Sequence, residues 1–210
     1  MHRLVPAILT DSKHEFRAAL DLVRQMTDYV QIDIMDGSFT DNQTLLPREI
    51  FHENYEGLTF EAHIMASKPT VFDLIQSLKS FPACTRVIVH REAADTVEEL
   101  RQMVNRIKDL GKEVGIAINP GTDIREIGKV VKKINSVQFM GVTPGAYGGT
   151  FHPEVLGAVR DFQERYTMSP AQIAWDGAAT KERIPELVAA GVESVAVGSA
   201  IFRAEDPVAA

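Results

Sequence analysis

Short apolar runs alternate with amphipathic segments along the whole chain. Eight of the apolar runs have the length and composition of buried strands. They cover residues 3–9, 29–34, 58–64, 86–90, 113–118, 136–142, 172–176 and 194–198. Their regular recurrence predicts eight strands distributed over the full length of the protein.

The segments between these runs have helical spacing of their apolar residues. Helices are predicted at 12–26, 69–80, 96–110, 123–134, 153–166 and 180–190, with a short one starting near Pro47. Ser12, followed by Glu15, is a typical N-terminal cap, and Gly111 and Gly191 are typical helix stops. The chain is therefore expected to repeat a strand–helix unit.

Repeated strand–helix units imply parallel strands joined by right-handed crossovers. Eight units in 210 residues predict a single (β/α)8 barrel, a TIM barrel, as one domain over residues 1–210, with a doubly wound open sheet as the alternative. Only "RAEDPVAA" follows Phe202, so the eighth helix should be short or missing. Because the barrel surface there would lie bare, a homo-oligomer is expected.

The charge balance narrows the range of partners. The net charge is -7 and no basic run is present, which argues against nucleic acid and anionic membranes as partners. No apolar stretch is long enough to cross a bilayer, and the N-terminal residues do not resemble a secretory signal. The single cysteine, Cys84, is expected to be a buried core residue, and its isolation is typical of a reducing cytoplasm.

In such barrels the chemistry lies where the strands end and the following loops begin. The inward face of the second strand would carry Gln31, Asp33 and Met35. Other strand ends offer Ala7, His63, Met65, His90 (followed by Glu92), Met140 and Asp176. Asp33 and Asp176 stand three strands apart around the ring, so they should face each other across the mouth. One could remove a proton from a substrate carbon and the other return it on the opposite face, while His63 could help to ligate a divalent metal.

Each of these residues also has a structural interpretation. An aspartate before glycine often only forms a turn, which is sufficient to account for Asp36. A single strand histidine is often a hydrogen-bonded core residue, and methionines at strand spacing often only pack. It is their convergence on one predicted mouth that favours a functional site.

Glycine-rich loops follow the last three strands: "GVTPGAYGGTF", "DGAAT" and "VGSAIF". Backbone N–H groups at such glycines can approach an anion, and loops at this end of a barrel are a frequent phosphate site. A phosphorylated small-molecule substrate is therefore predicted. No G-x-G-x-x-G opens a helix after the first strand, which argues against a dinucleotide.

The ordered set "PAILTDS", "IDIMDGSF", "AHIM", "VHREA", "NPGT", "MGVTPGAYGGTF", "WDGAAT" and "VGSAIF" resembles the ribulose-phosphate 3-epimerases from about residue 4 to residue 202. The resemblance implies a (β/α)8 barrel that interconverts D-ribulose 5-phosphate and D-xylulose 5-phosphate by moving the C3 proton. It implies Asp33 and Asp176 as acid and base, and a divalent metal (Zn, Fe, Mn or Mg) held by Asp33, His63 and Asp176. The implied sugar and phosphate contacts are Met35, Met65, Met140, Gly148, Gly177, Gly198 and Ser199.

The chain departs from the family pattern at several places. Gln31 stands where the family usually has a metal-ligating histidine, and Ala7 where it usually has serine. The loop reads "TPGAYGG", with Thr143 in the usual asparagine position and Ala146–Tyr147 as an apparent insertion, and Ala178 replaces a glycine. An amide oxygen is a weaker ligand for zinc or iron than imidazole, so Gln31 could be a fourth ligand for Mn²⁺ or Mg²⁺, or the site could be metal-free.

Three hypotheses follow. The first is an epimerase acting on a ketose phosphate. The second is a related barrel that binds a sugar phosphate without the full metal-dependent reaction. The third, a decarboxylase or aldolase of similar fold, is disfavoured because the strand ends carry methionines where such enzymes need lysine, and Lys68 lies in a predicted loop.

Overall fold

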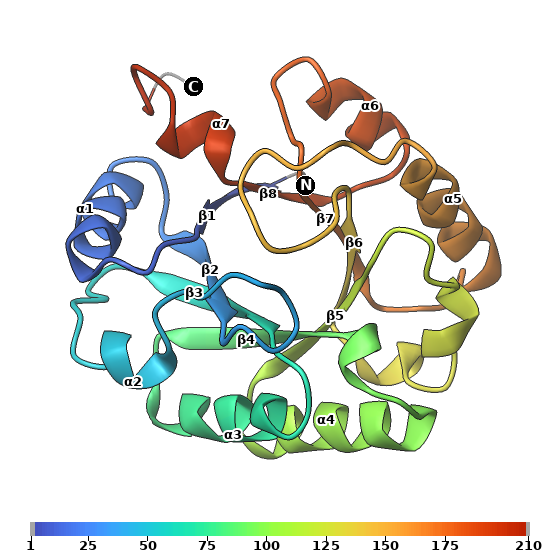
Figure 1. The fold of residues 1–210 in the computed structure, drawn as a ribbon. Coiled ribbons are helices and arrows are strands. Elements are labelled where there is room, and N and C mark those ends of the chain that lie inside the picture. Colours follow the sequence, from blue (N-terminus) through green and yellow to red (C-terminus); the bar gives the residue numbers. More distant parts are fainter. Residues whose placement is uncertain (1–2, 209–210) are drawn as a thin grey trace.

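The computed structural model describes residues 3–208 and shows a closed barrel of parallel strands in the order β1 to β8 (Figure 1). The strands are β1 (Arg3–Ile8), β2 (Tyr29–Met35), β3 (Thr59–Met65), β4 (Cys84–His90), β5 (Glu113–Ile118), β6 (Ser136–Met140), β7 (Gln172–Asp176) and β8 (Ser194–Val197). Strand β1 pairs with both β2 and β8, which closes the ring. The predicted (β/α)8 barrel is confirmed, and the open sheet is excluded.

Helices surround this barrel. They are α1 (Lys13–Val23), α2 (Pro47–Ile50), α3 (Thr70–Ser77), α4 (Val97–Asp109), α5 (Val155–Arg165), α6 (Ile184–Ala189) and α7 (Ser199–Phe202). Short 3-10 turns are η1 (Leu78–Ser80), η2 (Arg91–Ala93), η3 (Ile124–Ile127) and η4 (Val131–Lys133). The predicted cap of α1 is present, since the side chain of Ser12 accepts from the Glu15 N–H, and α4 has a similar cap in which the side chain of Thr96 accepts from the Glu99 N–H.

One predicted helix is wrong. Residues 123–134 form the two turns η3 and η4 rather than a continuous α-helix. Gly128 lies between them, and glycine weakens a helix interior. A Cβ built there would also lie 2.8 Å from the hydroxyl oxygen of Tyr166, so the segment is shaped by close packing against the end of α5.

Alternation along the strands separates the core from the site. On β2, Val30, Ile32 and Ile34 belong to the large hydrophobic core between barrel and helices. Inside the barrel, Ile88 and Met140 belong to a separate small cluster. Cys84 is buried in the main core, as expected. The polar residues at the inward strand ends thus lie between the small cluster inside the barrel and the pocket at its mouth.

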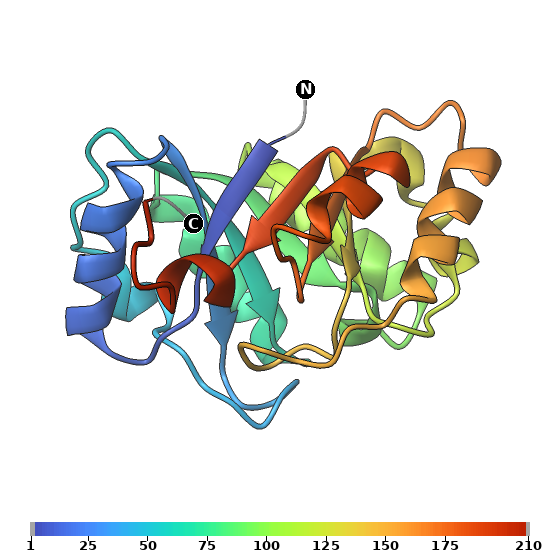
Figure 2. The same ribbon diagram turned by 90° about the horizontal axis from the view of Figure 1, so that it is seen from above.

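All strands point toward one end of the barrel, where the loops after β2 and β6 lie (Figure 2). These two loops contact each other, because the Asn42 side chain donates a hydrogen bond to the carbonyl oxygen of Gly145. Gly145 also packs against Thr40, which a Cβ at residue 145 would approach to 3.0 Å. This end is the mouth of the barrel, where the predicted site lies.

The eighth helix is short, as predicted. It is the four-residue α7, which lies near α1 (Figure 1). Residues of α1 and Phe202 of α7 line a common groove, and Leu4 of β1 is 54% exposed. The barrel is therefore less completely covered beside β1 and β8 than elsewhere.

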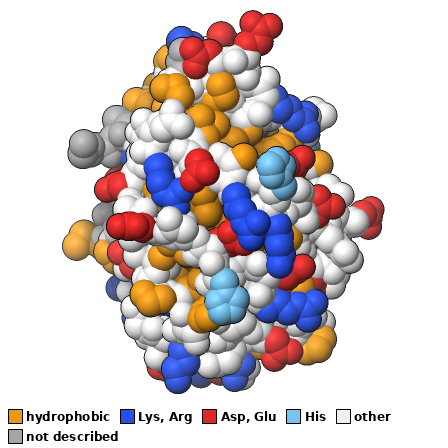
Figure 3. All heavy atoms as spheres, turned by 90° about the vertical axis from the view of Figure 1, so that its left-hand side faces the viewer, with side chains coloured by type: hydrophobic (Ala, Val, Ile, Leu, Met, Phe, Trp, Pro, Cys, Tyr) orange, Lys and Arg blue, Asp and Glu red, His pale blue; other side chains and the backbone are white. Residues whose placement is uncertain are grey.

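The protein surface carries mixed charge. On the face drawn in Figure 3, positive and negative side chains are interspersed and hydrophobic side chains lie in separate groups. Among the described helices, none combines the length and the hydropathy that crossing a membrane requires.

Candidate active site

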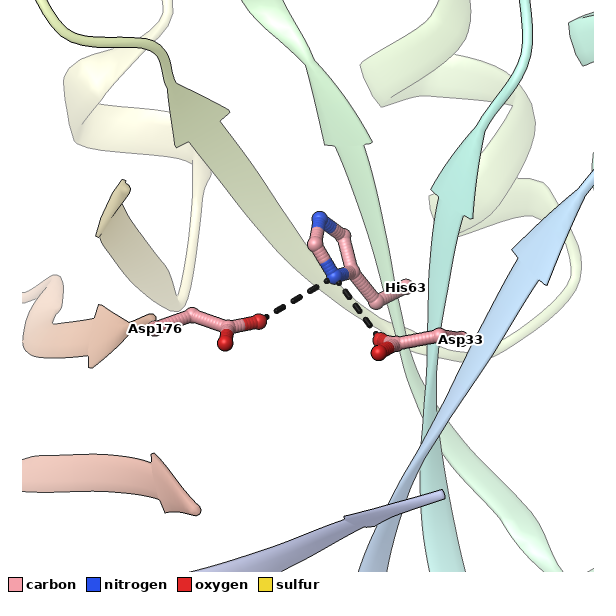
Figure 4. A group of neighbouring side chains, drawn as sticks. All are labelled: Asp33, His63 and Asp176. Carbon is pink, nitrogen blue, oxygen red and sulfur yellow. Dashed lines mark hydrogen bonds and ion pairs between the residues drawn. The ribbon is translucent and has the colours of Figure 1, made fainter. Parts of the chain in front are cut away.

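Two carboxylates and an imidazole converge at the barrel mouth. Asp33 and His63 are register partners on β2 and β3, and Asp176 ends β7 on the far side of the ring. The Nδ1 atom of His63 lies 3.0 Å from Oδ1 of Asp33 and 3.3 Å from Oδ2 of Asp176 (Figure 4). The three predicted residues therefore form one cluster.

Gln31 completes this cluster in a way that the sequence does not reveal. Its amide Nε2 donates to Oδ1 of Asp33 over 2.9 Å and to Oδ2 of Asp176 over 2.7 Å, so it bridges the two carboxylates. Its amide oxygen Oε1 is buried and has no hydrogen-bond partner among the described residues. The amide hydrogens thus supply positive partial charge to both carboxylates.

Each carboxylate keeps one oxygen free. Oδ2 of Asp33 and Oδ1 of Asp176 accept no hydrogen bond from residues 3–208, whereas Oδ2 of Asp176 lies within reach of Gln31, Gln138 and His63. Both aspartates line the pocket at the mouth. Two oxygens without protein partners are therefore available to a molecule that enters.

The electrostatics place a shared proton in this cluster. Burial raises the pKa of Asp33, as does the nearby charge of Asp176, while His63 opposes the rise. Burial by itself would lower the pKa of His63, but hydrogen bonds and charges from Asp176 and Asp33 outweigh it and raise that pKa to about 10. A positive charge between the two carboxylates is therefore strongly favoured. In the protein without a metal ion, the imidazolium of His63 supplies this charge.

The donor set fits a divalent metal. Asp33, His63 and Asp176 each offer one ligand atom, and these atoms lie within 4.8 Å of one another. Ligand atoms around a tetrahedral zinc ion lie about 3.4 Å apart, close to the 3.0 and 3.3 Å measured from Nδ1 of His63. Rotation of the Gln31 amide group by about 180° would exchange the positions of Nε2 and Oε1. The amide oxygen Oε1 could then serve as a fourth ligand to the metal ion.

The glycine-rich loops form the other wall of the pocket. Gly148, Gly177, Gly198 and Ser199, the residues for which phosphate contacts are expected, all line it. The backbone N–H groups of Gly148, Gly177 and Ala178 donate to no other group between residues 3 and 208. Ala178 has φ of 50°, a conformation that glycine adopts more easily. The wall thus offers unpaired donors of the kind that an anion requires.

The three methionines do not share one position. Met65 and Met140 line the pocket. Met35 is fully buried and its sulfur accepts a hydrogen bond from the Thr40 hydroxyl in the loop above. Its place is therefore under the loop after β2, rather than on the pocket wall.

Tyr147 is hydrogen-bonded to the backbone at the end of β1. The Tyr147 hydroxyl donates to the carbonyl oxygen of Ala7 over 2.6 Å and accepts from the Leu9 N–H over 2.9 Å. Its ring packs so closely on Gly198 that a Cβ there would lie 2.2 Å from the ring. The apparent insertion in the loop after β6 thus spans the mouth and delivers a hydroxyl to the end of β1.

Sequence reasoning missed Gln138 altogether. Its Nε2 donates to Oδ2 of Asp176 over 3.1 Å. The available signal was its position two residues before Met140, which places both on the inward face of β6. The sequence places His90 and Glu92 at the mouth without a partner; in the structure Nε2 of His90 lies next to Nε2 of His63, and Nδ1 of His90 lies next to Glu92.

Comparison with known proteins shows the family of this chain. A sequence model described as the Ribulose-phosphate 3 epimerase family matches residues 3–202. The chain belongs to this family. It is 30% identical over 183 residues to the ribulose-phosphate 3-epimerase of Escherichia coli (strain K12), which covers 85% of this chain and 79% of that protein.

Other relatives are similar at the same level. The cytoplasmic isoform of ribulose-phosphate 3-epimerase from Oryza sativa is 28% identical to this chain over 210 residues, which cover 98% of this chain and 89% of that protein. The chloroplastic enzyme of Arabidopsis thaliana is 30% identical over 184 residues, or 85% of this chain and 63% of that protein. The 3-hexulose-6-phosphate synthase of Salmonella typhimurium shares the fold, with a TM-score of 0.65 and 17% identity over 99% of this chain and 93% of that chain.

Proposed function

We propose that this member of the family is a ketose-phosphate 3-epimerase that interconverts D-ribulose 5-phosphate and D-xylulose 5-phosphate. The observation that carries the proposal is the pair Asp33 and Asp176, which approach one pocket from β2 and β7, each with an unpaired oxygen. Epimerisation at a carbon next to a carbonyl needs one base and one acid on opposite faces of that carbon.

The protein residues would act as follows. One aspartate takes the C3 proton with its free oxygen, which leaves an enediolate, and the other returns a proton to the opposite face. Gln138 holds the inner oxygen of Asp176 by a hydrogen bond, and in the protein without a metal Gln31 holds the inner oxygens of both carboxylates, so that the outer oxygens face the substrate. Met65 and Met140 supply an apolar lining that limits access of water to the reacting carbon.

A divalent cation would be held by Asp33, His63 and Asp176, with Oε1 of Gln31 as the fourth ligand, and it would stabilise negative charge on the enediolate oxygens. An amide oxygen in the set favours Mn²⁺ or Mg²⁺ relative to Zn²⁺ or Fe²⁺. The substrate phosphate would accept hydrogen bonds from the loop N–H groups at Gly148, Gly177, Gly198 and Ser199.

A decarboxylase or Schiff-base aldolase lacks support, since no lysine lines the pocket in the described part of the chain. The competing hypothesis is a barrel that binds sugar phosphates without turnover.

We also expect a homo-oligomer in the cytoplasm, with the groove between α1 and α7 as the surface covered by a partner copy. A monomer by light scattering at micromolar concentration would contradict the oligomer.

Proton exchange at C3 tests the function directly. The protein is incubated with D-ribulose 5-phosphate in D2O, first metal-free and then with Mn²⁺, Mg²⁺, Zn²⁺ or Fe²⁺, and the C3 signal is followed by NMR. Deuterium at C3 together with formation of xylulose 5-phosphate is the expected result. Absence of exchange under every condition, with phosphate ligands still bound, would support the non-catalytic barrel instead.

A further inference from the structure

A line of buried polar groups leads away from the metal-ligand cluster into β4. Nε2 of His63 lies 2.9 Å from Nε2 of His90, and Nδ1 of His90 lies 3.4 Å from Oε2 of Glu92. Both imidazoles are completely buried. The ring of Phe39 packs on His90 with 4.6 Å between ring centroids, which limits rotation of that imidazole. Water therefore has little access to these links.

Glu92 is fixed at its other oxygen. Oε1 accepts from the Asn119 N–H over 2.9 Å and from the Thr122 hydroxyl over 2.5 Å. These hydrogen bonds and His90 outweigh burial and lower the pKa of Glu92, so the carboxylate is anionic. Oε2 of Glu92 and Nδ1 of His90 have no hydrogen-bond partner among the described residues, and the 3.4 Å contact between these two atoms is an ion-pair distance.

An anionic carboxylate can only accept hydrogen bonds, and this sets the direction of the whole line. The proton of neutral His90 must lie on Nδ1, facing Glu92. Its Nε2 then carries a lone pair toward His63, so Nε2 of His63 must carry a proton. The reverse arrangement would place the Nδ1 lone pair of His90 against the carboxylate.

We infer that Glu92, acting through His90, is a positioning residue. It fixes the His63 ring so that its Nε2–H points to His90 and its Nδ1 points to Asp33 and Asp176. Nδ1 is the atom that would ligate a metal ion. Hydrogen bonds from ligating histidines to carboxylates commonly fix the ring tautomer in this way. The inference rests on the proposed role of His63 as a ligand, but its structural content holds with or without turnover.

Imidazole ¹⁵N NMR of the full-length protein tests the inference, both metal-free and with Zn²⁺. The Nε2–H···Nε2 pair should be recognised by a nitrogen–nitrogen coupling across its hydrogen bond, which assigns His63 and His90 without mutation. The expected result is a proton on Nε2 of His63 and on Nδ1 of His90 in both samples. A proton on Nε2 of His90 would overturn the inference.

Glu92→Gln offers a sharper test. Since the Asn119 N–H and the Thr122 hydroxyl both donate to Oε1, the amide oxygen should keep that place and turn its NH2 group toward His90. The proton of His90 should then move to Nε2, which reverses the line. If His90 keeps its Nδ1 proton in this variant, the carboxylate does not set the direction.

Metal binding gives a second readout that does not depend on epimerase activity. His90→Asn, which breaks the line without touching a ligand, should weaken Zn²⁺ binding by about 10- to 100-fold in a chelator competition. Glu126→Gln is the matched control, because Glu126 is a nearby carboxylate paired with Arg91 outside the line. Equal Zn²⁺ affinity in wild type and His90→Asn would contradict the positioning role even if the proton-exchange assay shows an active epimerase. An inactive enzyme with the predicted protonation pattern would refute only the proposed function.

Discussion

The inside of this barrel holds buried carboxylates at both ends, and the two ends neutralise them differently. At the closed end Glu61 accepts from Arg86 over 3.1 Å and from the Tyr29 hydroxyl over 3.1 Å. At the mouth Asp33 and Asp176 share one imidazole and one amide. Glu61 and His63 lie two residues apart on β3, so the contrast arises within a single strand.

The contrast separates a structural ion pair from a functional cluster. A guanidinium keeps its proton at every accessible pH and holds the Glu61 carboxylate in place permanently. An imidazole can lose its proton or exchange it for a metal ion, and an amide contributes no full charge. The mouth is therefore left with anions whose counter-charge can change, which is what proton transfer requires.

The largest expected effect is loss of turnover in Asp176→Asn. The amide keeps the size of the side chain but cannot take or deliver the proton, so kcat should fall by about 10²- to 10⁴-fold. Deuterium incorporation at C3 measures the loss, and the thermal midpoint should stay near that of wild type. Glu61→Gln at the closed end is the control and should retain kcat. Comparable losses in both variants would remove the distinction between the two ends.

Arg86→Met should produce the opposite pattern. Removal of one partner leaves Glu61 buried without its cation, and breaking such a pair costs about 3–5 kcal/mol of unfolding free energy. Urea denaturation measures the change, while the kcat of the folded fraction should remain unaltered. Adding Glu61→Gln in the same chain should restore part of the stability. Unchanged stability of the single variant would show that Arg86 does not neutralise Glu61.

The third test alters the counter-charge at the mouth. Gln31→His replaces the amide by an imidazole nitrogen, which binds Zn²⁺ better than an amide oxygen does, so Zn²⁺ affinity should rise at least about tenfold. Isothermal titration measures the affinity. Gln31→Met removes the amide without adding a nitrogen ligand and should not tighten binding. Equal affinity of wild type and Gln31→His would mean that Gln31 does not limit the metal site.

Much of this arrangement could be predicted from the sequence, because it follows from strand periodicity. Alternation on β2 and the order of the strands place Asp33 and Asp176 at one mouth without any knowledge of contacts. The helix at 123–134 was wrong because Gly128 and its packing against Tyr166 outweigh the helical spacing.

Other features depend on three-dimensional contacts that no local pattern encodes. The amide of Gln31 could have been a ligand or a donor, and only the positions of both carboxylates show its bridging hydrogen bonds. Gln138 and the direction of the line from Glu92 to His63 likewise depend on neighbours that lie far away in sequence. Strand register predicts which side chains lie close together, but only the three-dimensional structure shows which atom of each side chain is hydrogen-bonded to which partner.

The smallest expected effect concerns Tyr147, which links the mouth to the end of β1. In Tyr147→Phe the ring can still pack on Gly198, but the Leu9 N–H loses its acceptor and the Ala7 carbonyl its donor. The loop after β6 should then hold its phosphate-binding N–H groups less firmly. A loss of about 1 kcal/mol corresponds to a KM about fivefold higher, with kcat nearly unchanged because neither aspartate is touched. Steady-state kinetics with D-ribulose 5-phosphate separates the two constants. A fall in kcat at constant KM would instead place the Tyr147 hydroxyl among the groups that act on the reacting carbon.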